Sequence, residues 1–298
     1  MPFHPRLLVL FVCAFGCLAA SLHAAANALS FRTETSATWI DNISRTSNPP
    51  DQREAARFSA TAAATTFRSW KSRFVTSADF AATLEHVPAY DRADTLTLGP
   101  QLGLRRRIGL GAFAPTFDLT LAAQHRHARL TAARGWTQSL GLRFSKRLTS
   151  AFRASLHADW SRHDARHAAF DVSHRQLSAQ LTWDFDPRWQ LTAGAARFAG
   201  YFTANAAGPT WARALAGDFG PSVLDYYRSV PRLATHLYGP SWVSYRVSGD
   251  ANLFWLELSP VLGRNTSLPF RFERIDATNR IGVNYRQDLV SLSLLHRF

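Results

Sequence analysis

Apolar and polar residues alternate along most of this chain with a period of two. Within residues 74–85, Phe80 and Leu84 share one face while Asp79 and Glu85 share the other. The same alternation recurs over residues 95–105, 117–124, 140–144, 152–160 and 177–185. A period of two over eight to twelve residues indicates a strand with one apolar face. The pattern therefore predicts an all-β chain.

A soluble sandwich and a membrane barrel both show this alternation, but other features favour the barrel. The expected strands have about the 9–11 residues that a tilted strand needs to cross a bilayer. Their polar faces carry Gly, Ser, Thr, Gln, Arg and Asp, which suits a wet lumen. Short and long connections also alternate, as in bacterial barrels. Short turns are expected at 69–72, 146–149 and 186–188, and longer segments at 45–54, 86–94, 128–135, 161–169 and 201–225.

The sequence thus predicts a closed antiparallel transmembrane β-barrel of about twelve strands, an even number as single-chain bacterial barrels have. The expected strands are 30–43, 55–68, 73–85, 95–107, 116–127, 136–146, 151–161, 174–185, 189–200, 238–248, 251–262 and 283–298. Fourteen would result if 225–237 or 268–276 also paired into the wall. Segment 201–225 contains two Gly-Pro pairs and is either a plug inside the lumen or an external flap.

Residues 1–28 read as a cleaved export signal, which leaves 29–298 as the barrel. Arg6 precedes an apolar run over 7–20, and the small-residue motif Ala26-Asn27-Ala28 follows it. A run of this length is too short to span a bilayer. An uncleaved anchor and a lipoprotein signal are the alternatives, although the residues before Cys17 fit the lipoprotein pattern poorly. Both cysteines of the chain belong to this signal, so no cofactor or metal is expected from cysteine chemistry.

The net charge of +13 comes almost entirely from arginine, because Lys71 and Lys146 are the only lysines. Such a balance can indicate nucleic-acid binding. Export and the spread of arginines over wall and loops argue against that partner. Arginines expected in outer loops instead suit the phosphates of lipopolysaccharide, which guanidinium binds in a bidentate manner. These arginines are Arg126, Arg129 and Arg134.

Tryptophans lie mostly near the ends of the expected strands, where barrels carry aromatic girdles at both membrane interfaces. The alternative is ordinary packing of large aromatics at strand ends. The girdle candidates are Trp70, Trp136, Trp160, Trp183, Trp189, Trp242 and Trp255.

The last ten residues alternate strictly and end on Phe298. This segment resembles the C-terminal strand of bacterial outer-membrane β-barrel proteins, which characteristically ends in an aromatic residue. The resemblance implies a location in the bacterial outer membrane, contact with its lipids, and recognition of the strand by the barrel-assembly machinery. His296 departs from the more usual aromatic or aliphatic residue. The layout is also similar to uncharacterised proteobacterial barrel proteins, through Asp41-Asn42, Thr278-Asn279 and Tyr285.

Several charged residues are expected on the inward face near the periplasmic mouth. They are Arg73, Arg105, Arg143, Arg153, Asp118 and Asp184. Arg105 and Asp118 flank one turn and are expected to pair, whereas no acid separates Arg143 from Arg153. A cationic constriction would favour anionic solutes. Alternatively, these side chains only fill the lumen and pair locally.

Enzymatic and metal sites have weaker support. His157, Asp159 and Ser161 share one strand face, but positions two apart lie about 6.6 Å apart along the axis, which disfavours direct hydrogen bonds. His163 and His167, with Asp164, could bind a metal only if that loop were helical. The sequence therefore favours a porin-like passive channel for small solutes, with anions as the candidate class. A plugged structural or lipopolysaccharide-contacting barrel is the alternative, and a lipid hydrolase with no catalytic residue assigned is third.

Overall fold

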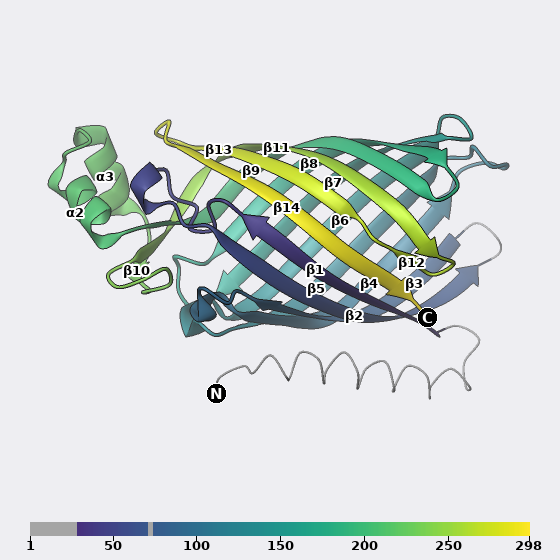
Figure 1. Cartoon of the computed structure of the whole chain (residues 1–298), viewed down its shortest axis with the longest axis horizontal. Coiled ribbons are helices and arrows are strands. Elements are labelled where there is room, and N and C mark those ends of the chain that lie inside the picture. Colours follow the sequence, from purple (N-terminus) through teal and green to yellow (C-terminus); the bar gives the residue numbers. More distant parts are fainter. Residues whose placement is uncertain (1–28, 71–73) are drawn as a thin grey trace.

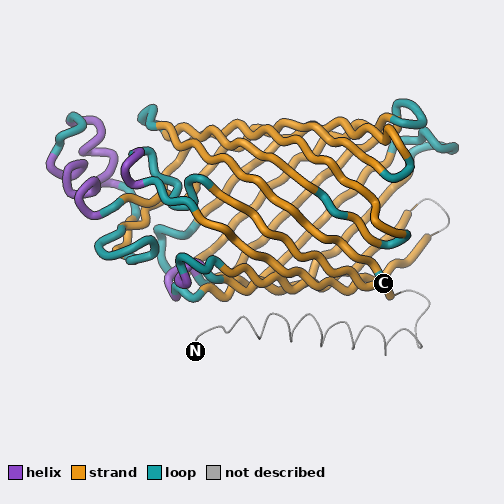
Figure 2. The backbone as a smooth tube through the Cα atoms, in the orientation of Figure 1, coloured by secondary structure: helices purple, strands orange, loops and turns teal. Residues whose placement is uncertain are grey.

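The computed structural model describes residues 29–70 and 74–298. The expected export signal and Arg73 lie outside the described residues. The chain forms one antiparallel sheet that closes on itself, with a small helical region at one end (Figures 1 and 2). None of the helices within the described ranges is long and apolar enough to cross a membrane.

Twelve strands form the wall, and each pairs with its neighbour around the ring. In order they are β1 (Leu29–Ile40), β2 (Ala55–Trp70), β3 (Phe74–His86), β4 (Thr95–Arg107), β5 (Thr116–Ala128), β6 (Gly135–Arg147), β7 (Phe152–Ala165), β8 (Val172–Asp186), β9 (Trp189–Ala206), β11 (Val243–Gly263), β13 (Phe270–Asn279) and β14 (Asn284–Arg297). The pairing of β1 with β14 closes the ring, and Phe298 N–H donates to the carbonyl of Phe31 at this seam (2.9 Å). A closed ring leaves no unpaired edge, as a spanning sheet requires.

The predicted number of twelve is confirmed, although two of the strands were assigned incorrectly. The expected strands 238–248 and 251–262 are a single strand, β11, in which Gly249 and Asp250 form no turn. Segment 268–276, expected only in a barrel of fourteen, supplies most of β13. Two short strands lie beside the ring: β10 (Arg232–Ala234) pairs with β11, and β12 (Thr266–Ser267) pairs with β11 and β14.

The outer face of the wall is apolar, as the alternation predicts for a surface that contacts lipid. Paired residues such as Leu102 and Leu121 are both exposed, and Leu177 of β8 has 63% of its surface exposed. Five of the expected girdle tryptophans are also exposed: Trp70, Trp136, Trp160, Trp183 and Trp189. Two are not, because Trp242 is buried in a loop and Trp255 faces the lumen, where its ring covers Gly194.

The two ends of the barrel differ. We call one the turn end, because tight connections such as 148–151 and 187–188 join its strands and both described termini lie there. We call the other the loop end, which carries the segments 41–54, 87–94, 129–134, 166–171, 207–242 and 280–283. The helices α2 (Gly208–Ala216) and α3 (Pro221–Ser229) extend beyond the wall at the loop end (Figure 1).

Candidate functional site

The lumen at the turn end holds two adjoining cavities of about 530 and 450 Å³. Val75, Arg105, Asp118 and Arg143 line both of them. A ring of twelve strands encloses more space than its inward side chains fill, because barrel diameter grows with strand number. We call this space the turn-end chamber.

The larger cavity of the turn-end chamber is strongly cationic. Among the described residues, its lining includes one carboxylate, Asp118, and the inward-facing arginines Arg105, Arg107, Arg143, Arg147 and Arg153. Arg105 donates its Nε–H to Oδ1 of Asp118, so the predicted pair is confirmed. Asp118 also lies opposite Arg143 across the β5–β6 ladder. In the described part of the chain, Arg143 and Arg153 have no ion pair.

The structure thus brings together four of the six residues predicted for the periplasmic mouth, namely Arg105, Asp118, Arg143 and Arg153. Asp184 does not line the chamber. It accepts a hydrogen bond from Gln190 (2.7 Å) and lies 3.8 Å from Nη2 of Arg147. Whether this cluster selects among solutes stays a prediction.

His157 and Asp159 face the turn-end chamber from β7, and Nε2 of His157 lies 3.1 Å from Oδ1 of Asp159. No hydrogen bond joins the two side chains among the described contacts, so the expectation that direct hydrogen bonds are disfavoured at this spacing is not contradicted. Side chains lean along a strand and shorten the axial separation. Ser161 forms no hydrogen bond with His157 among the described contacts, so the catalytic arrangement is incomplete.

The possible metal site depends on a helix that does not form. His163 and Asp164 belong to β7, where successive side chains point to opposite faces. His163 is buried and contacts Oγ1 of Thr137 (2.9 Å), whereas Asp164 accepts a hydrogen bond from Arg162 on the outside (2.7 Å). Within residues 29–70 and 74–298, no group of three or more potential ligands is close enough to hold a metal ion.

The lumen at the loop end holds a second space, which we call the vestibule. It comprises adjoining cavities of about 520 and 230 Å³. The linings of both include Arg45, His174, Phe198, Phe202, Ile275 and Gln287. Phe198 and Phe202 point inward from β9, and Phe202 packs edge-on against Tyr285 with 5.4 Å between ring centroids. One wall of the vestibule is therefore apolar and aromatic.

Charged side chains line another part of the vestibule. Arg57 lies 3.5 Å from Glu85, between Nη1 and Oε1, while Arg45 and Arg126 project into the same cavity. Arg45 lies in the loop 41–54, with a left-handed backbone (φ 49°). Burial lowers the pKa of its guanidinium, and the positive charges of Arg57 and Arg126 add to this effect. Arg126 is thus a lumen residue rather than the outer-loop residue that the sequence predicted.

A segment spanning 235–242, which we call the lid, crosses the mouth at the loop end. It leaves the barrel beside β11, yet it contacts the β3–β4 loop, which lies halfway round the twelve-strand ring. Arg92 of that loop donates to the carbonyl of Thr235 (2.8 Å), and Tyr90 packs edge-on against Tyr238 with 5.0 Å between centroids. Tyr238 also donates to the carbonyl of Ile43 (2.8 Å). Burial raises the pKa of Tyr238 to about 12.

The sequence left open whether segment 201–225 plugs the lumen or forms an external flap, and its position in the structure decides between the two. Residues 201–206 continue β9, and α2 and α3 follow beyond the wall rather than inside the lumen. Trp211 and Tyr227 of these helices pack with Tyr245, Val247 and other buried residues in a hydrophobic core at the loop end. The helices therefore brace the end of the barrel, and the segment that covers the mouth lies further along the chain.

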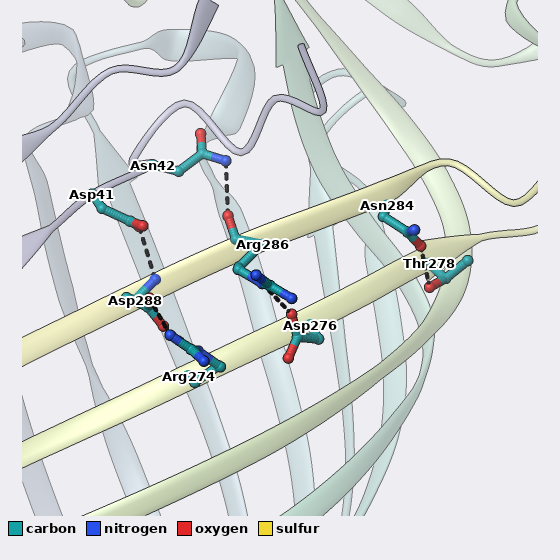
Figure 3. A network of polar contacts seen from close by, with 8 residues as sticks. All are labelled: Asp41, Asn42, Arg274, Asp276, Thr278, Asn284, Arg286 and Asp288. Atoms are coloured by element: carbon teal, nitrogen blue, oxygen red, sulfur yellow. Dashed lines mark hydrogen bonds and ion pairs between the residues drawn. The ribbon is translucent and has the colours of Figure 1, made fainter. Parts of the chain in front are cut away.

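A polar network on the outer wall fixes the start of the loop 41–54 (Figure 3). Oδ1 of Asp41 accepts the N–H of Asp288 (2.8 Å), and the Asn42 amide donates to the carbonyl of Arg286 (2.9 Å). Asp288 also forms two hydrogen bonds with Arg274 (2.7 Å each). The early Asp-Asn pair and the late strands thus meet in space, and their contacts hold the loop that carries Arg45.

Part of the vestibule could have been read from the alternation. On β5 the inward positions Asp118, Thr120, Ala122 and Gln124 continue to Arg126, and on β9 the inward positions continue to Phe198 and Phe202. Arg45 and Tyr238 lie in loops and follow no period. Of the other arginines expected outside, Arg129 pairs with Asp91 (3.0 Å) and Arg134 donates to the carbonyl of Ala128 (2.7 Å).

Comparisons with known proteins support the fold. No family model matches the chain, and no curated protein matches it. The structure is similar to the COG4313 outer membrane channel from Pseudomonas putida F1, with a TM-score of 0.59 at 10% identity, covering 91% of this chain and 95% of that one. The KdgM porin in complex with disordered oligogalacturonate also matches, with a TM-score of 0.47 at 7% identity over 90% and 99%. The likeness to the COG4313 channel shows that the chain has the fold of a bacterial outer-membrane β-barrel.

Proposed function

We propose that this protein is a gated passive channel of the bacterial outer membrane for small solutes, with a preference for anions. The observation that carries the proposal is the turn-end chamber, where five arginines and one carboxylate of the described residues line a cavity of about 530 Å³. A pore lined by one sign of charge favours counter-ions. Known channels with this architecture, such as the COG4313 channel, give the proposal a precedent at the level of fold.

Planar-bilayer recording tests this proposal. The purified protein is expected to give stepwise conductance with a preference for chloride over potassium. Arg143→Ala combined with Arg153→Ala is expected to reduce that preference, because these two arginines carry positive charge without an ion pair among the described residues. The matched control is Arg166→Ala combined with Arg228→Ala, which removes the same charge from exposed sites at the loop end. Equal loss of selectivity in both double variants would contradict the proposed role of the chamber.

A closed barrel with a structural or lipopolysaccharide-contacting role is the second candidate. The lid favours it, since 235–242 and the loop 41–54 meet over the mouth through Tyr238 and Ile43. Silence at all voltages, in the wild type and after loosening of the lid, would select this function. Binding of purified lipopolysaccharide to the protein in detergent would then test the contact with lipid phosphates.

Insertion in the outer membrane is part of the proposal, with Phe298 as the recognition signal for the barrel-assembly machinery. Phe298 lies at the seam between β14 and β1, so the final residue of the chain takes part in closure of the ring. Phe298→Ala is expected to reduce the amount of protein in outer-membrane fractions, measured by immunoblot. An unchanged amount would contradict that role.

A further inference from the structure

The vestibule combines two surfaces that simple passage of small ions does not require. Lumen-facing positions of a water-filled barrel are ordinarily polar. Here Phe198, Phe202 and Ile275 face inward at the loop end, beside the guanidinium of Arg45. An apolar wall next to a cationic group is the arrangement expected of a site for an amphipathic anion.

The aromatic wall is held in place by its neighbours. Phe198 packs against His174 with 4.7 Å between ring centroids, and Phe202 packs against Tyr285. Gly200 lies between them on β9 with φ 152°, and a Cβ there would lie 2.3 Å from the carbonyl oxygen of Ser173. Glycine therefore allows the close approach of β8 and β9 that positions this wall.

The cationic part of the vestibule has guanidinium groups without a carboxylate partner. Within the described chain, Arg45 and Arg126 form no ion pair, although both line the 520 Å³ cavity. The carboxylates nearby are engaged elsewhere. Glu85 accepts a hydrogen bond from Thr95 (2.8 Å) and pairs with Arg57, while Glu273 pairs with Arg271. An added carboxylate would complete the arrangement with charge-assisted hydrogen bonds.

We propose that the vestibule binds an aromatic monocarboxylate, with the carboxylate on Arg45 and Arg126 and the ring against Phe198 and Phe202. The proposal deepens the proposed function, on which it rests, by naming a substrate class for the channel. A neutral aromatic compound would leave both guanidinium groups without a carboxylate partner. A small inorganic anion would leave the aromatic wall without contact. One ligand that carries both groups satisfies both surfaces.

The test measures equilibrium binding to the full-length protein in detergent by titration calorimetry, with detergent alone as the blank. Benzoate is the probe, acetate carries the head group alone, and benzyl alcohol carries the ring without the charge. Benzoate is expected to bind at least about tenfold more tightly than either of the others, because burial of the ring and pairing of the carboxylate each contribute to affinity. Equal affinities for benzoate and acetate would overturn the proposal.

Arg45→Gln combined with Arg126→Gln is expected to weaken benzoate binding by about tenfold or more and to leave benzyl alcohol unchanged. Arg166→Gln combined with Arg228→Gln is the matched control, since both arginines are exposed and lie outside the vestibule. If the first double variant does not fold, Phe202→Ala replaces it. This variant is expected to lower the ratio of the affinity for benzoate to the affinity for acetate. An unchanged ratio would contradict the assigned wall.

Measurements of benzoate binding and of conductance, taken together, distinguish failure of the vestibule site from failure of the proposed channel function. Tight benzoate binding by a protein that is silent in bilayers would contradict the channel and support the site. Anion-selective conductance without a preference for benzoate over acetate in the binding experiment would contradict the site and support the channel.

Discussion

The two halves of the lumen are built from the same strands but differ in what lines and closes them. Among the residues that the structure describes, no aromatic side chain lines the larger cavity of the turn-end chamber, and arginine dominates its lining. The vestibule has an aromatic wall, a hydrophobic core behind it and a lid across its mouth. Strand alternation decides which residues face inward, whereas the loops decide whether that space is open. Under the proposed function, ion selectivity is assigned to the turn end and gating to the loop end.

The largest effect is expected from loosening the lid. Arg92→Ala combined with Tyr238→Ala removes the hydrogen bond to Thr235, the bond to Ile43 and the contact with Tyr90. Together these contacts contribute about 3 kcal/mol to the closed state, which corresponds to a roughly hundredfold change in the ratio of closed to open time. Single-channel recording measures the ratio of closed to open time, and Arg228→Ala is the control. An unchanged open probability would mean that the lid does not gate the channel.

A smaller effect is expected from Gly194→Ala, which tests whether Trp255 faces the lumen or a lipid interface. A Cβ at Gly194 would lie 2.2 Å from the ring of Trp255, which also contacts Arg271 with 5.1 Å between the guanidinium carbon and the ring centroid. Overpacking of this kind costs about 1–3 kcal/mol. The free energy of unfolding in detergent should fall by that amount, while Gly263→Ala, with open space around it, should be neutral. Equal free energies of unfolding for Gly194→Ala and Gly263→Ala would mean that the ring of Trp255 does not lie over Gly194.

The smallest effect on open probability is expected from a change of pH between 7 and about 10. With the lid closed, the pKa of Tyr238 is about 12, and an unburied tyrosine titrates near about 10. A raised pKa stabilises the closed lid fully below about pH 10, and this contribution is lost as the pH rises toward 12. Open probability should therefore stay constant from pH 7 to about 10 and increase above it. Tyr238→Phe should remove the increase, and a wild-type transition near pH 8 would contradict the assignment.

The barrel could be predicted from the sequence because alternation is strong wherever the outward face of the wall is apolar. The assignment of strands was wrong over β11 and β13, for a physical reason. Asp250, Arg274 and Asp276 lie on the outward face near the loop end, whereas Leu253 and Ile275 face inward, so the usual order of apolar outside and polar inside is reversed there. The charges of β13 are matched by partners on other strands, such as Asp288 for Arg274 and Arg286 for Asp276. Such pairs become visible only when the register is known.

The candidate site could be predicted in part, for similar reasons. Arg105, Asp118, Arg143 and Arg153 lie on regular strands beside short turns, so the period of two places them in one cavity. Arg45 and Tyr238 reach the vestibule from long loops, and the hydrogen bond from Tyr238 to Ile43 joins segments almost two hundred residues apart. No local pattern carries that information.

The most direct test of the two-part lumen is the reversal potential in a potassium chloride gradient, recorded with the lid loosened by Arg92→Ala and Tyr238→Ala. We expect current that reverses toward the chloride equilibrium potential, and a shift toward zero when Arg143→Ala and Arg153→Ala are added. Absence of current with the lid loosened, or a reversal potential that those two arginines do not affect, would contradict the account.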